Sequence, residues 1–325
     1  MTKRLLATAA AIAVVGAFTV SAPAPAEAAP KFKCETAKLI VPWKAGGGTH
    51  VLFSIFEKTI QNLDVSPKIK VVTIPGQGGN KGAKEAKKAK ADGCTLFAIH
   101  QSAMTSFLNG RVKFSFEAFD TVSLLTSTPD IIGASKGAPF NDLKGFLAAA
   151  KANPGTVKTG ATFGSTSQFV WLLLEETTGI KLKFVPYDGT RQRMTALLSG
   201  AITMGGLNVA SGRKYLETGE LKGFAIAANA RSKHLPNLPT LKELGVNMEY
   251  AIKRGIVAPK GTPRDMIDHW AGIFKKAAEN PDLMKQMDAK GTEVAWVGPD
   301  EYRKWADETF DAHKKVAIKI GMYKP

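Results

Sequence analysis

The stretch that decides the fold is LIVPWKAGGGTHVLFSIFEKTI, residues 39–60. An apolar run typical of a buried strand stops at Pro42, and the apolar pattern of a helix begins at Thr49. The glycines at 46–48 form the turn between them and let a ligand approach the main chain. The first helical amides have no partner within the helix, and the helix dipole adds positive charge there. The turn therefore suits a carboxylate or phosphate, although a plain tight turn without a ligand would have the same sequence pattern.

The first 28 residues have the form of a secretory signal peptide. Lys3 and Arg4 precede the apolar segment LLATAAAIAVVGAFTV, and a small-residue cleavage site ends at Ala28. The apolar segment is shorter than the roughly 18 residues that a membrane span needs. We therefore expect cleavage near Ala28 and an exported protein that is long enough for two domains of ordinary size.

The chain carries a formal net charge of +16. A basic protein suggests nucleic acid as a partner, but the lysines are scattered and no RNP, zinc-finger or helix-turn-helix pattern accompanies them. Export makes an anionic small molecule or an anionic membrane surface the better match. We therefore expect no nucleic-acid partner.

Cys34 and Cys94 are the two cysteines of the chain. Outside the cytoplasm an even pair favours a disulfide, and each cysteine lies just before an apolar run typical of a strand. The bond is feasible if these two strands are neighbours in a sheet, which the spacing alone does not decide.

Short apolar runs alternate with helical patterns along the chain, which predicts α/β layers with mainly parallel sheets. The expected strands lie at residues 38–42, 69–73, 94–99, 121–126, 130–134, 157–161, 182–186, 202–207, 222–228 and 255–258. The expected helices lie at residues 49–62, 80–90, 102–108, 142–151, 166–178, 190–199, 209–217, 264–279, 282–289 and 299–320.

The sequence contains no low-complexity linker, so two domains must be joined by strands that cross between them. The candidates are TVSLLTSTPDIIGA, residues 121–134, and YAIKRGIVAP, residues 250–259. These crossings predict a first lobe made of residues 29–127 and 254–325, and a second lobe made of residues 128–253. Two ordered crossing strands form a hinge.

Glycine turns between a strand and a helix recur in IPGQGGNKG, TGATFGSTSQ and VPYDGT, which start at residues 74, 159 and 185. Such turns at the carboxyl ends of two sheets are expected to converge on one crevice. None of them has the spacing of a dinucleotide or P-loop motif, and the histidines lack metal-binding spacing. No nucleophile elbow or catalytic triad is recognisable. We therefore predict no catalytic residues, metal or cofactor.

The order of the motifs resembles the Bug family, the periplasmic substrate-binding receptors of tripartite tricarboxylate transporters. The resemblance runs from about residue 38 to residue 321, through VPWKAGGGTH, PGQGGNKGAKEAKKAKADGCTL, TGATFGSTSQF, FVPYDGTRQRMTALLSG, LPNLPTLKELG, VAPKGTP and GPDEYRKWADE. It implies a periplasmic binding protein-like (type II) fold, with two α/β lobes joined by two crossing strands around a central cleft. It also implies a periplasmic, monomeric, non-enzymatic protein that closes on a small carboxylate and delivers it to the membrane permease subunits.

The resemblance also implies which residues contact the ligand. From the two glycine turns of the first lobe these are Trp43, Ala45, Gly46, Gly47, Gly48, Thr49, Gly78, Gly79 and Asn80. From the opposite lobe they are Thr162, Ser165, Thr166, Tyr187 and Asn208.

Other candidates follow from the residues themselves. His100 and Ser102 end an expected strand and should face the crevice, although a lone histidine is also a common structural group. Arg191 and Arg193 open a helix, which is an unfavourable place for cations unless an anion is near. We therefore predict that Arg191 clamps a carboxylate through its fork of donors, with a solvated surface role as the alternative.

The chain departs from the family pattern at His50, where Asp is common, and at Lys253, where Trp is frequent. Both changes make the cleft more positive, so we expect a ligand with two or more carboxylates and no amine. Thr203 also replaces a frequent Asp, and nothing in the sequence explains that change.

Two other functions remain open at this point. The same receptor could present its ligand to a membrane sensor kinase, or the chain could be an exported enzyme that acts on a carboxylate. An enzyme needs a paired acid and base or a metal, and the sequence shows neither in a recognisable spacing.

Overall fold

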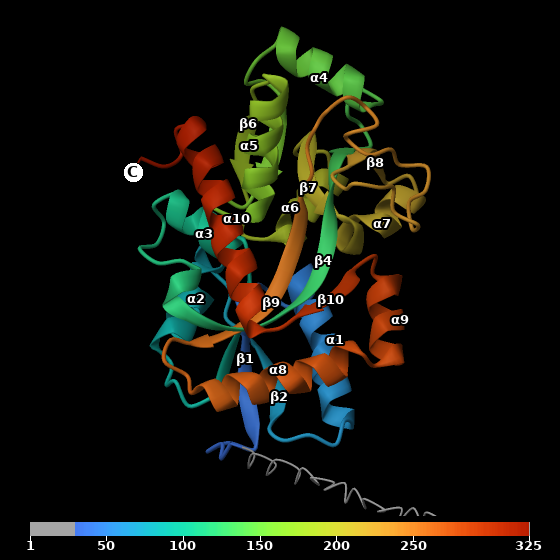
Figure 1. Cartoon of the computed structure of the whole chain (residues 1–325). Coiled ribbons are helices and arrows are strands. Elements are labelled where there is room, and N and C mark those ends of the chain that lie inside the picture. Colours follow the sequence, from blue (N-terminus) through green and yellow to red (C-terminus); the bar gives the residue numbers. More distant parts are fainter. Residues whose placement is uncertain (1–29, 325) are drawn as a thin grey trace, which may run out of the picture.

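The computed structural model describes residues 30–324, so the predicted signal peptide lies outside the described residues. Two α/β lobes are stacked one above the other and joined by two long strands (Figure 1). The strands are β1 (Thr36–Val41), β2 (Lys68–Thr73), β3 (Thr95–His100), β4 (Phe119–Ser135), β5 (Lys158–Ala161), β6 (Lys183–Pro186), β7 (Met204–Asn208), β8 (Leu221–Ile226), β9 (Ala251–Pro259) and β10 (Glu293–Val297).

Helices alternate with these strands as the sequence predicts. The α-helices are α1 (Gly48–Asn62), α2 (Asn80–Lys88), α3 (Ser102–Leu108), α4 (Leu143–Ala152), α5 (Thr166–Thr178), α6 (Thr190–Leu198), α7 (Val209–Glu217), α8 (Arg264–Ala278), α9 (Pro281–Ala289) and α10 (Pro299–Lys319). Two short 3₁₀ turns lie at Gln77–Gly79 and Phe116–Ala118. The periplasmic binding protein-like fold class is confirmed.

The strands form a continuous sheet in the order β2-β1-β3-β9-β4-β7-β5-β6, and β8 and β10 both pair with β4. Pairs within each lobe, such as β1 with β2 and β5 with β6, are parallel. The crossing strands β4 and β9 run antiparallel to each other and to their other partners. The sheet is therefore mixed, and the expectation of mainly parallel sheets is wrong because both lobes share these reversed strands.

β4 connects the two lobes through its whole length. It pairs with β9 from Phe119 to Pro129 and then with β7 and β8 from Asp130 onward. The sequence predicted two strands here, at residues 121–126 and 130–134 of the crossing segment, and Thr128-Pro129-Asp130 has residues typical of a turn. The structure keeps the segment extended, with Thr128 and Asp130 buried.

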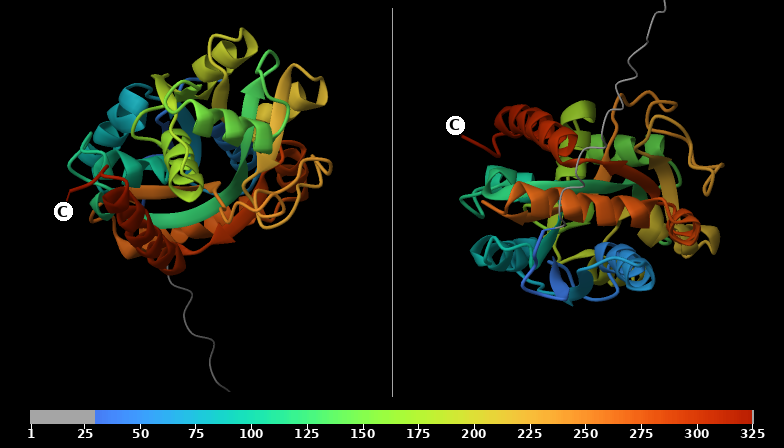
Figure 2. Two further views of the ribbon diagram at one scale, coloured as in Figure 1. Left: turned by 90° about the horizontal axis from the view of Figure 1, so that it is seen from above. Right: turned by 60° about the horizontal axis from the view of Figure 1, so that its bottom comes forward.

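Each lobe has its own hydrophobic core. In the first lobe, β1 and its neighbours pack against α1 and α8 through residues such as Leu39, Phe56 and Trp270. In the second lobe, Phe146, Trp171 and their neighbours form a separate core cluster with Ile132 of β4. Figure 2 shows α8 lying across the first lobe, which leaves the carboxyl ends of the strands free to face the second lobe.

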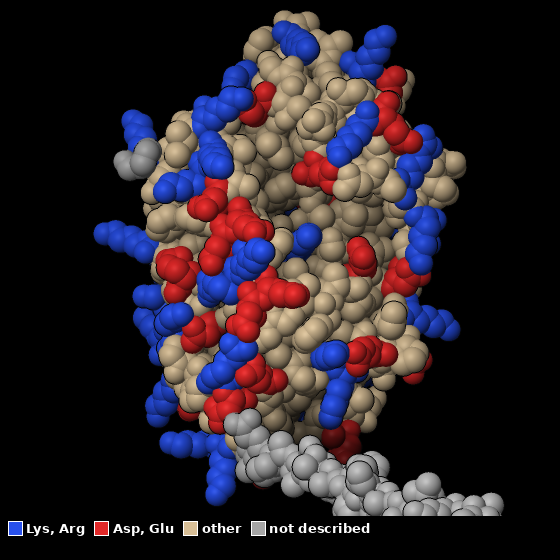
Figure 3. Space-filling view, in the orientation of Figure 1, with Lys and Arg blue, Asp and Glu red and all other residues tan. Residues whose placement is uncertain are grey.

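The C-terminal helix α10 contacts both lobes. Near its start, Tyr302 and Ala306 are buried in a cluster of the first lobe. Further along, the His313 ring stacks on Phe169 of the second lobe, with ring centroids 4.4 Å apart. Basic side chains are spread over the face shown in Figure 3, whereas acidic side chains gather over α10.

The two lobes also touch beside α10, through α3 and the segment that follows it. The hydroxyls of Thr105 and Ser106 donate to the Gly164 carbonyl at 3.0 and 2.7 Å, and Arg111 donates to the Phe163 carbonyl at 2.6 Å. The Gly78 amide donates to Asp188 Oδ1 at 3.0 Å. The structure therefore describes a closed arrangement of the lobes.

The predicted disulfide is confirmed between Cys34 and Cys94, whose Cα atoms are 5.9 Å apart. It joins the amino-terminal ends of the neighbouring parallel strands β1 and β3. The glycine turn after β1 lies at the opposite end of these strands.

Replacing both cysteines, Cys34→Ser with Cys94→Ser, should lower the free energy of unfolding by about 2–4 kcal/mol, because the bond closes a long loop in the unfolded chain. Ligand affinity at 25 °C should stay unchanged, since the bond is remote from the glycine turn. Urea unfolding and calorimetry measure the two effects separately. Loss of affinity in a variant that is still folded would show that the bond also shapes the site.

Candidate functional site

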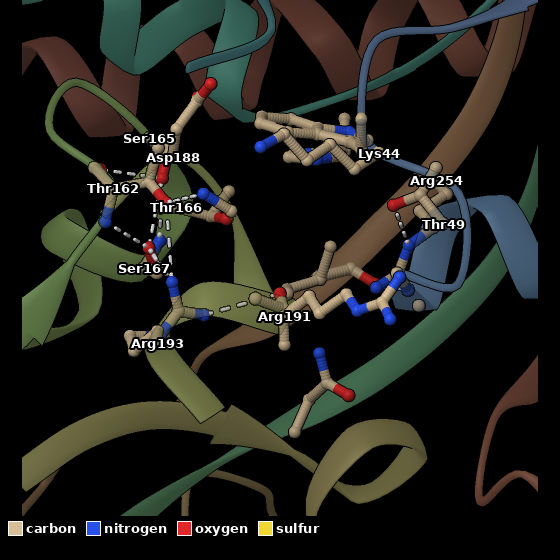
Figure 4. A pocket seen from close by; sticks show the side chains of 18 of the residues that line it. Lys44, Thr49, Thr162, Ser165, Thr166, Ser167, Asp188, Arg191, Arg193 and Arg254 are labelled. Carbon is tan, nitrogen blue, oxygen red and sulfur yellow. Dashed lines mark hydrogen bonds between the residues drawn. The ribbon is translucent and has the colours of Figure 1, made fainter. Parts of the chain in front are cut away.

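A cavity of about 50 Å³ lies between the lobes, where the carboxyl ends of β1, β5 and β6 meet the crossing strands (Figure 4). The lining residues are Trp43, Lys44, Gly47, Gly48, Thr49, His100, Asp130, Thr162, Ser165, Thr166, Ser167, Asp188, Gly189, Thr190, Arg191, Arg193, Asn208, Ile252 and Arg254. A second hollow of about 520 Å³ adjoins it and shares Gly47, Gly48, Thr190 and Arg191.

The amino-terminal end of α1 faces the cavity without a side-chain cap. The Gly47 amide donates to the Lys44 carbonyl at 3.1 Å, and the Gly46 amide to His50 Nδ1 at 3.3 Å. Among the described residues the amides of Gly48 and Thr49 have no acceptor. These two amides are therefore available to an anion, as the glycine turn predicts.

Two helices of the second lobe also begin at the cavity. Thr166 is the first residue of α5 and Thr190 is the first residue of α6, which follows Gly189 without a side-chain cap. Their first amides lack acceptors within the part of the chain that the structure describes. Three helix amino termini therefore place partial positive charge around one cavity.

Arg254 of β9 is 2% exposed and lies on the first-lobe side of the cavity (Figure 4). Its Nε donates to Thr49 Oγ1 at 3.1 Å and its Nη1 to Thr128 Oγ1 at 2.8 Å. No carboxylate of the described residues forms an ion pair with it. Burial lowers the pKa of Arg254 to about 10, against an opposing effect of Asp130, so the guanidinium stays charged at neutral pH.

Arg193 of α6 is 4% exposed and lies on the opposite side (Figure 4). Its Nε donates to the Gly206 carbonyl at 2.9 Å, and its Nη1 to the hydroxyls of Thr162 and Ser167 at 3.3 Å each. Burial lowers the pKa of Arg193 to about 10, which again leaves it charged. The cavity is therefore flanked by two buried cations held by neutral groups.

Two acidic residues also reach the lining. Asp188 receives the Gly78 amide from the other lobe. Asp130 of β4 is 3% exposed, and its Oδ2 has no partner among the described residues. Burial raises the pKa of Asp130 to about 8, although Arg254 and Arg193 lower it.

His100 forms part of the wall beside Trp43. The two rings stack with centroids 5.1 Å apart, and His100 Nδ1 accepts the Ser102 amide at 3.2 Å. Burial, together with the charge of Arg254, lowers the pKa of His100 to about 3. The imidazole is therefore neutral at physiological pH and contributes shape and a dipole.

The structure brings about half of the predicted ligand contacts to the cavity. These are Trp43, Gly47, Gly48, Thr49, His100, Thr162, Ser165, Thr166, Arg191 and Asn208. Gly46 lines the adjoining hollow, while Asn80 and Ser102 line a small separate pocket behind Trp43 and His100.

The second glycine turn of the first lobe, residues 76–80, packs against Trp43 of the cavity wall. The Gly78 and Gly79 amides are already bonded to Asp188 and to the Gly76 carbonyl, and the Asn80 amide is bonded to the Gln77 carbonyl. A Cβ on Gly79 would lie 2.8 Å from the Trp43 ring. This turn therefore packs against Trp43 instead of offering its amides to a ligand.

The other predicted residues lie outside the lining. Ala45 is exposed, and His50 caps the Gly46 amide. Tyr187 packs against the second-lobe cluster around Leu197. Lys253 points toward the Trp305 ring, with its Nζ 5.7 Å from the ring centroid.

Sequence reasoning missed the most buried charges of the cavity, Asp130, Arg193 and Arg254, as well as Lys44, Ser167, Asp188, Gly189, Thr190 and Ile252. The sequence does contain a signal for these three charged residues. Arg193 stands in the unfavourable first turn of a helix, and Asp130 and Arg254 interrupt the two segments predicted to cross between lobes.

Two α/β lobes that meet on a cationic cavity define a solute-binding receptor of the periplasmic binding protein class. The chain belongs to the tripartite tricarboxylate transporter receptor family (TctC), whose family model matches residues 66–322. The members of this family are solute-binding receptors, and the family is not an enzyme family. Within residues 30–324 no helix is both long and apolar enough to cross a bilayer. In the same range, no three His, Cys, Asp or Glu residues are grouped to hold a metal ion.

Several proteins illustrate the relationship. BugT of Bordetella pertussis is 27% identical over 305 residues, which span 91% of this chain and 93% of BugT. The periplasmic binding protein BugD has the same fold, with a TM-score of 0.82 at 23% identity over 89% of this chain and 99% of BugD. MatC from Rhodopseudomonas palustris, solved with bound malate, gives a TM-score of 0.80 at 24% identity over 87% of this chain and 98% of MatC.

The packing of Gly79 against Trp43 gives a prediction with a matched control. Gly79 has φ +97° and Gly261 has φ +88°, but a Cβ on Gly261 meets nothing within 4 Å. Both Gly79→Ala and Gly261→Ala should be destabilising because of the positive φ. Only Gly79→Ala should also displace Trp43, weaken ligand binding and shift the tryptophan fluorescence. Equal effects of the two variants on affinity would contradict this role of the second turn.

Proposed function

We propose that this chain is a periplasmic solute-binding protein for a small organic acid with two or more carboxylates and no amine, which it delivers to a tripartite tricarboxylate transporter permease. The observation that carries the proposal is the burial of Arg193 and Arg254 on opposite sides of one cavity without a carboxylate bonded to either. A buried charge is stable only with good polar partners, and an anionic ligand supplies the missing countercharge.

The donors of the cavity fall into two groups, one in each lobe. The amides of Gly48 and Thr49 and the guanidinium of Arg254 belong to the first lobe, and we propose that they hold one carboxylate. The amides of Thr166 and Thr190 and the guanidinium of Arg193 belong to the second lobe, and they hold another. Two separated donor groups match a ligand with two acid groups, and malate in MatC is such an acid.

Binding by both lobes explains how the ligand selects the closed form. We propose lobes of residues 29–127 with 254–325 and of residues 128–253, hinged at β4 and β9. A ligand that bonds to both donor groups favours closure, and one that contacts a single lobe equally in both forms does not. Closure also removes water from the charged hydrogen bonds and strengthens them. The closed surface is what the permease then recognises, with no chemical change to the ligand.

The sharpest test uses calorimetry with malate, succinate, adipate and citrate, and with acetate and aspartate as comparisons. We expect the di- and tricarboxylates to include the tightest ligand. Arg254→Gln and Arg193→Gln should each weaken its binding by about 10- to 100-fold, because each removes a charged hydrogen-bond donor. Arg231→Gln is the matched control, since Arg231 is surface-exposed and paired with Glu243.

Circular dichroism and melting curves show whether each variant is folded. Tight binding of aspartate with no binding of the amine-free di- and tricarboxylates would overturn the proposed ligand class. Delivery to a permease is tested separately, by measuring uptake of the identified acid in cells with and without the gene. Unchanged uptake would contradict the transport role and leave the binding site intact.

A further inference from the structure

The backbone of Asp130 is fixed where the sheet changes partners. Its amide donates to the Tyr250 carbonyl at 3.1 Å, and its carbonyl accepts the Ala227 amide at 2.8 Å. Asp130 lies opposite Asn208 in the β4–β7 pairing, and both residues line the cavity. The carboxyl group is therefore held at the floor of the cavity by main-chain bonds that do not involve its side chain.

The side chain of Asp130 is buried, yet no described residue satisfies it. Oδ2 has no hydrogen-bond partner within residues 30–324, and neither arginine donates to the carboxyl group. Arg193 instead bonds to hydroxyls and to the Gly206 carbonyl, and Arg254 to Thr49, Thr128 and the Ile252 carbonyl. Because Asp130 lines the cavity, its unpartnered carboxyl group points to a partner supplied by the ligand.

The groups that face Asp130 come from several elements. Arg254 of β9 and Arg193 of α6 act on it as positive charges, and Asn208 of β7 lies opposite it as a neutral amide. Tyr250, just before β9, is buried beside it, and both burial and Asp130 raise the pKa of its hydroxyl, so Tyr250 stays neutral. His100 of β3 is neutral above pH 3 and lies near Arg254. None of these five neighbours titrates near pH 8, because the two guanidiniums, with pKa values of about 10, keep most of their protons up to pH 9.

We propose that Asp130 binds the ligand as a neutral carboxylic acid, donating its O–H to an anionic oxygen of the bound acid, so that binding takes up a proton wherever the empty site is ionised. This inference rests on the proposed function and adds a property of the same cavity. The proton comes from solvent and stays on the Asp130 carboxyl group while the ligand is bound, and above pH 8 it returns to solvent when the ligand leaves. No covalent bond of the ligand changes.

The charge balance explains why the neutral form is the binding form. An ionised Asp130 would repel a carboxylate at the cavity floor and would weaken the two guanidiniums that the ligand needs. A protonated Asp130 leaves both guanidiniums uncompensated and adds a donor. The raised pKa of the empty site, about 8, means that most molecules hold this proton at neutral pH. An anionic ligand stabilises the protonated form further.

Asp130 therefore acts as a selectivity residue. It favours a ligand that presents an anionic oxygen at the cavity floor, and it discriminates against a ligand that presents an ammonium group there. An ionised aspartate would have the opposite preference. The proton on Asp130 thus decides which class of acid the closed cavity accepts.

The pH dependence of affinity follows with a definite sign. Below pH 8 the empty site already carries the proton, and affinity should be nearly constant down to pH 7. Above pH 8 the proton must be taken up on binding, so affinity should fall by up to tenfold for each further pH unit. The expected uptake is about half a proton per ligand at pH 8 and close to one at pH 9.

The experiment measures binding of malate, succinate, adipate and citrate by calorimetry from pH 7 to 9, in pairs of buffers with different ionisation enthalpies. Asp130→Asn is the matched variant, because its amide keeps the shape and a donor but cannot titrate. We expect the wild-type protein to take up protons and lose affinity above pH 8. The Asp130→Asn variant should bind with nearly constant affinity and without proton uptake over this range.

The outcomes separate this inference from the proposed function. If no acid of the panel binds the wild-type protein, the proposed function fails and this inference fails with it. If an acid binds with constant affinity and no proton uptake, only the role of Asp130 fails. A pH slope that persists in Asp130→Asn would assign the proton to another group and overturn the inference. If Asp130→Asn does not fold, the absence of proton uptake by the wild-type protein above pH 8 still overturns the inference.

Discussion

The burial of two guanidiniums without a bonded countercharge is the constraint on which the rest of the structure depends. Removing a charged group from water costs several kcal/mol even after a protein relaxes around it. The chain offsets part of this cost with hydroxyls and carbonyls around Arg193 and Arg254. Neutral partners hold the two cations in place but do not neutralise them, and the closed lobes therefore surround a region that attracts anions.

The fold supplies the means to hold that arrangement. Arg254 lies on a crossing strand, so its position is set by the regular β-structure of the hinge and not by a loop. Arg193 is fixed by the first turn of α6, and the uncapped ends of α1 and α6 add amides directed at the same volume. Rigid strands and helix ends thus preorganise the donors before a ligand arrives. This reduces the conformational entropy that is lost on binding.

The sequence predicted the fold well because its signals are local. The glycine turn after residue 41, the helices and most of the strands were placed within a few residues of their observed limits, but β10 was not predicted. It failed where the decisive contact is long-range. Thr128-Pro129-Asp130 has the local chemistry of a turn, yet pairing with β9 keeps it extended. The glycine turn after residue 76 has the sequence pattern of an anion site. In the structure, however, the Gly78 amide is bonded to Asp188 and Gly79 packs against Trp43. No local pattern shows which buried charges face one another across a cavity.

The position of α10 has a mechanical consequence for the receptor. Its first turns are anchored in one core, while the His313 ring rests on Phe169 of the other lobe. A rotation about the two strands alone would separate these rings, so the receptor cannot swing open without either sliding this helix or breaking an aromatic contact. The C-terminal helix acts as a third connection between the lobes, and it restricts the direction and the extent of opening to motions that its far end can follow.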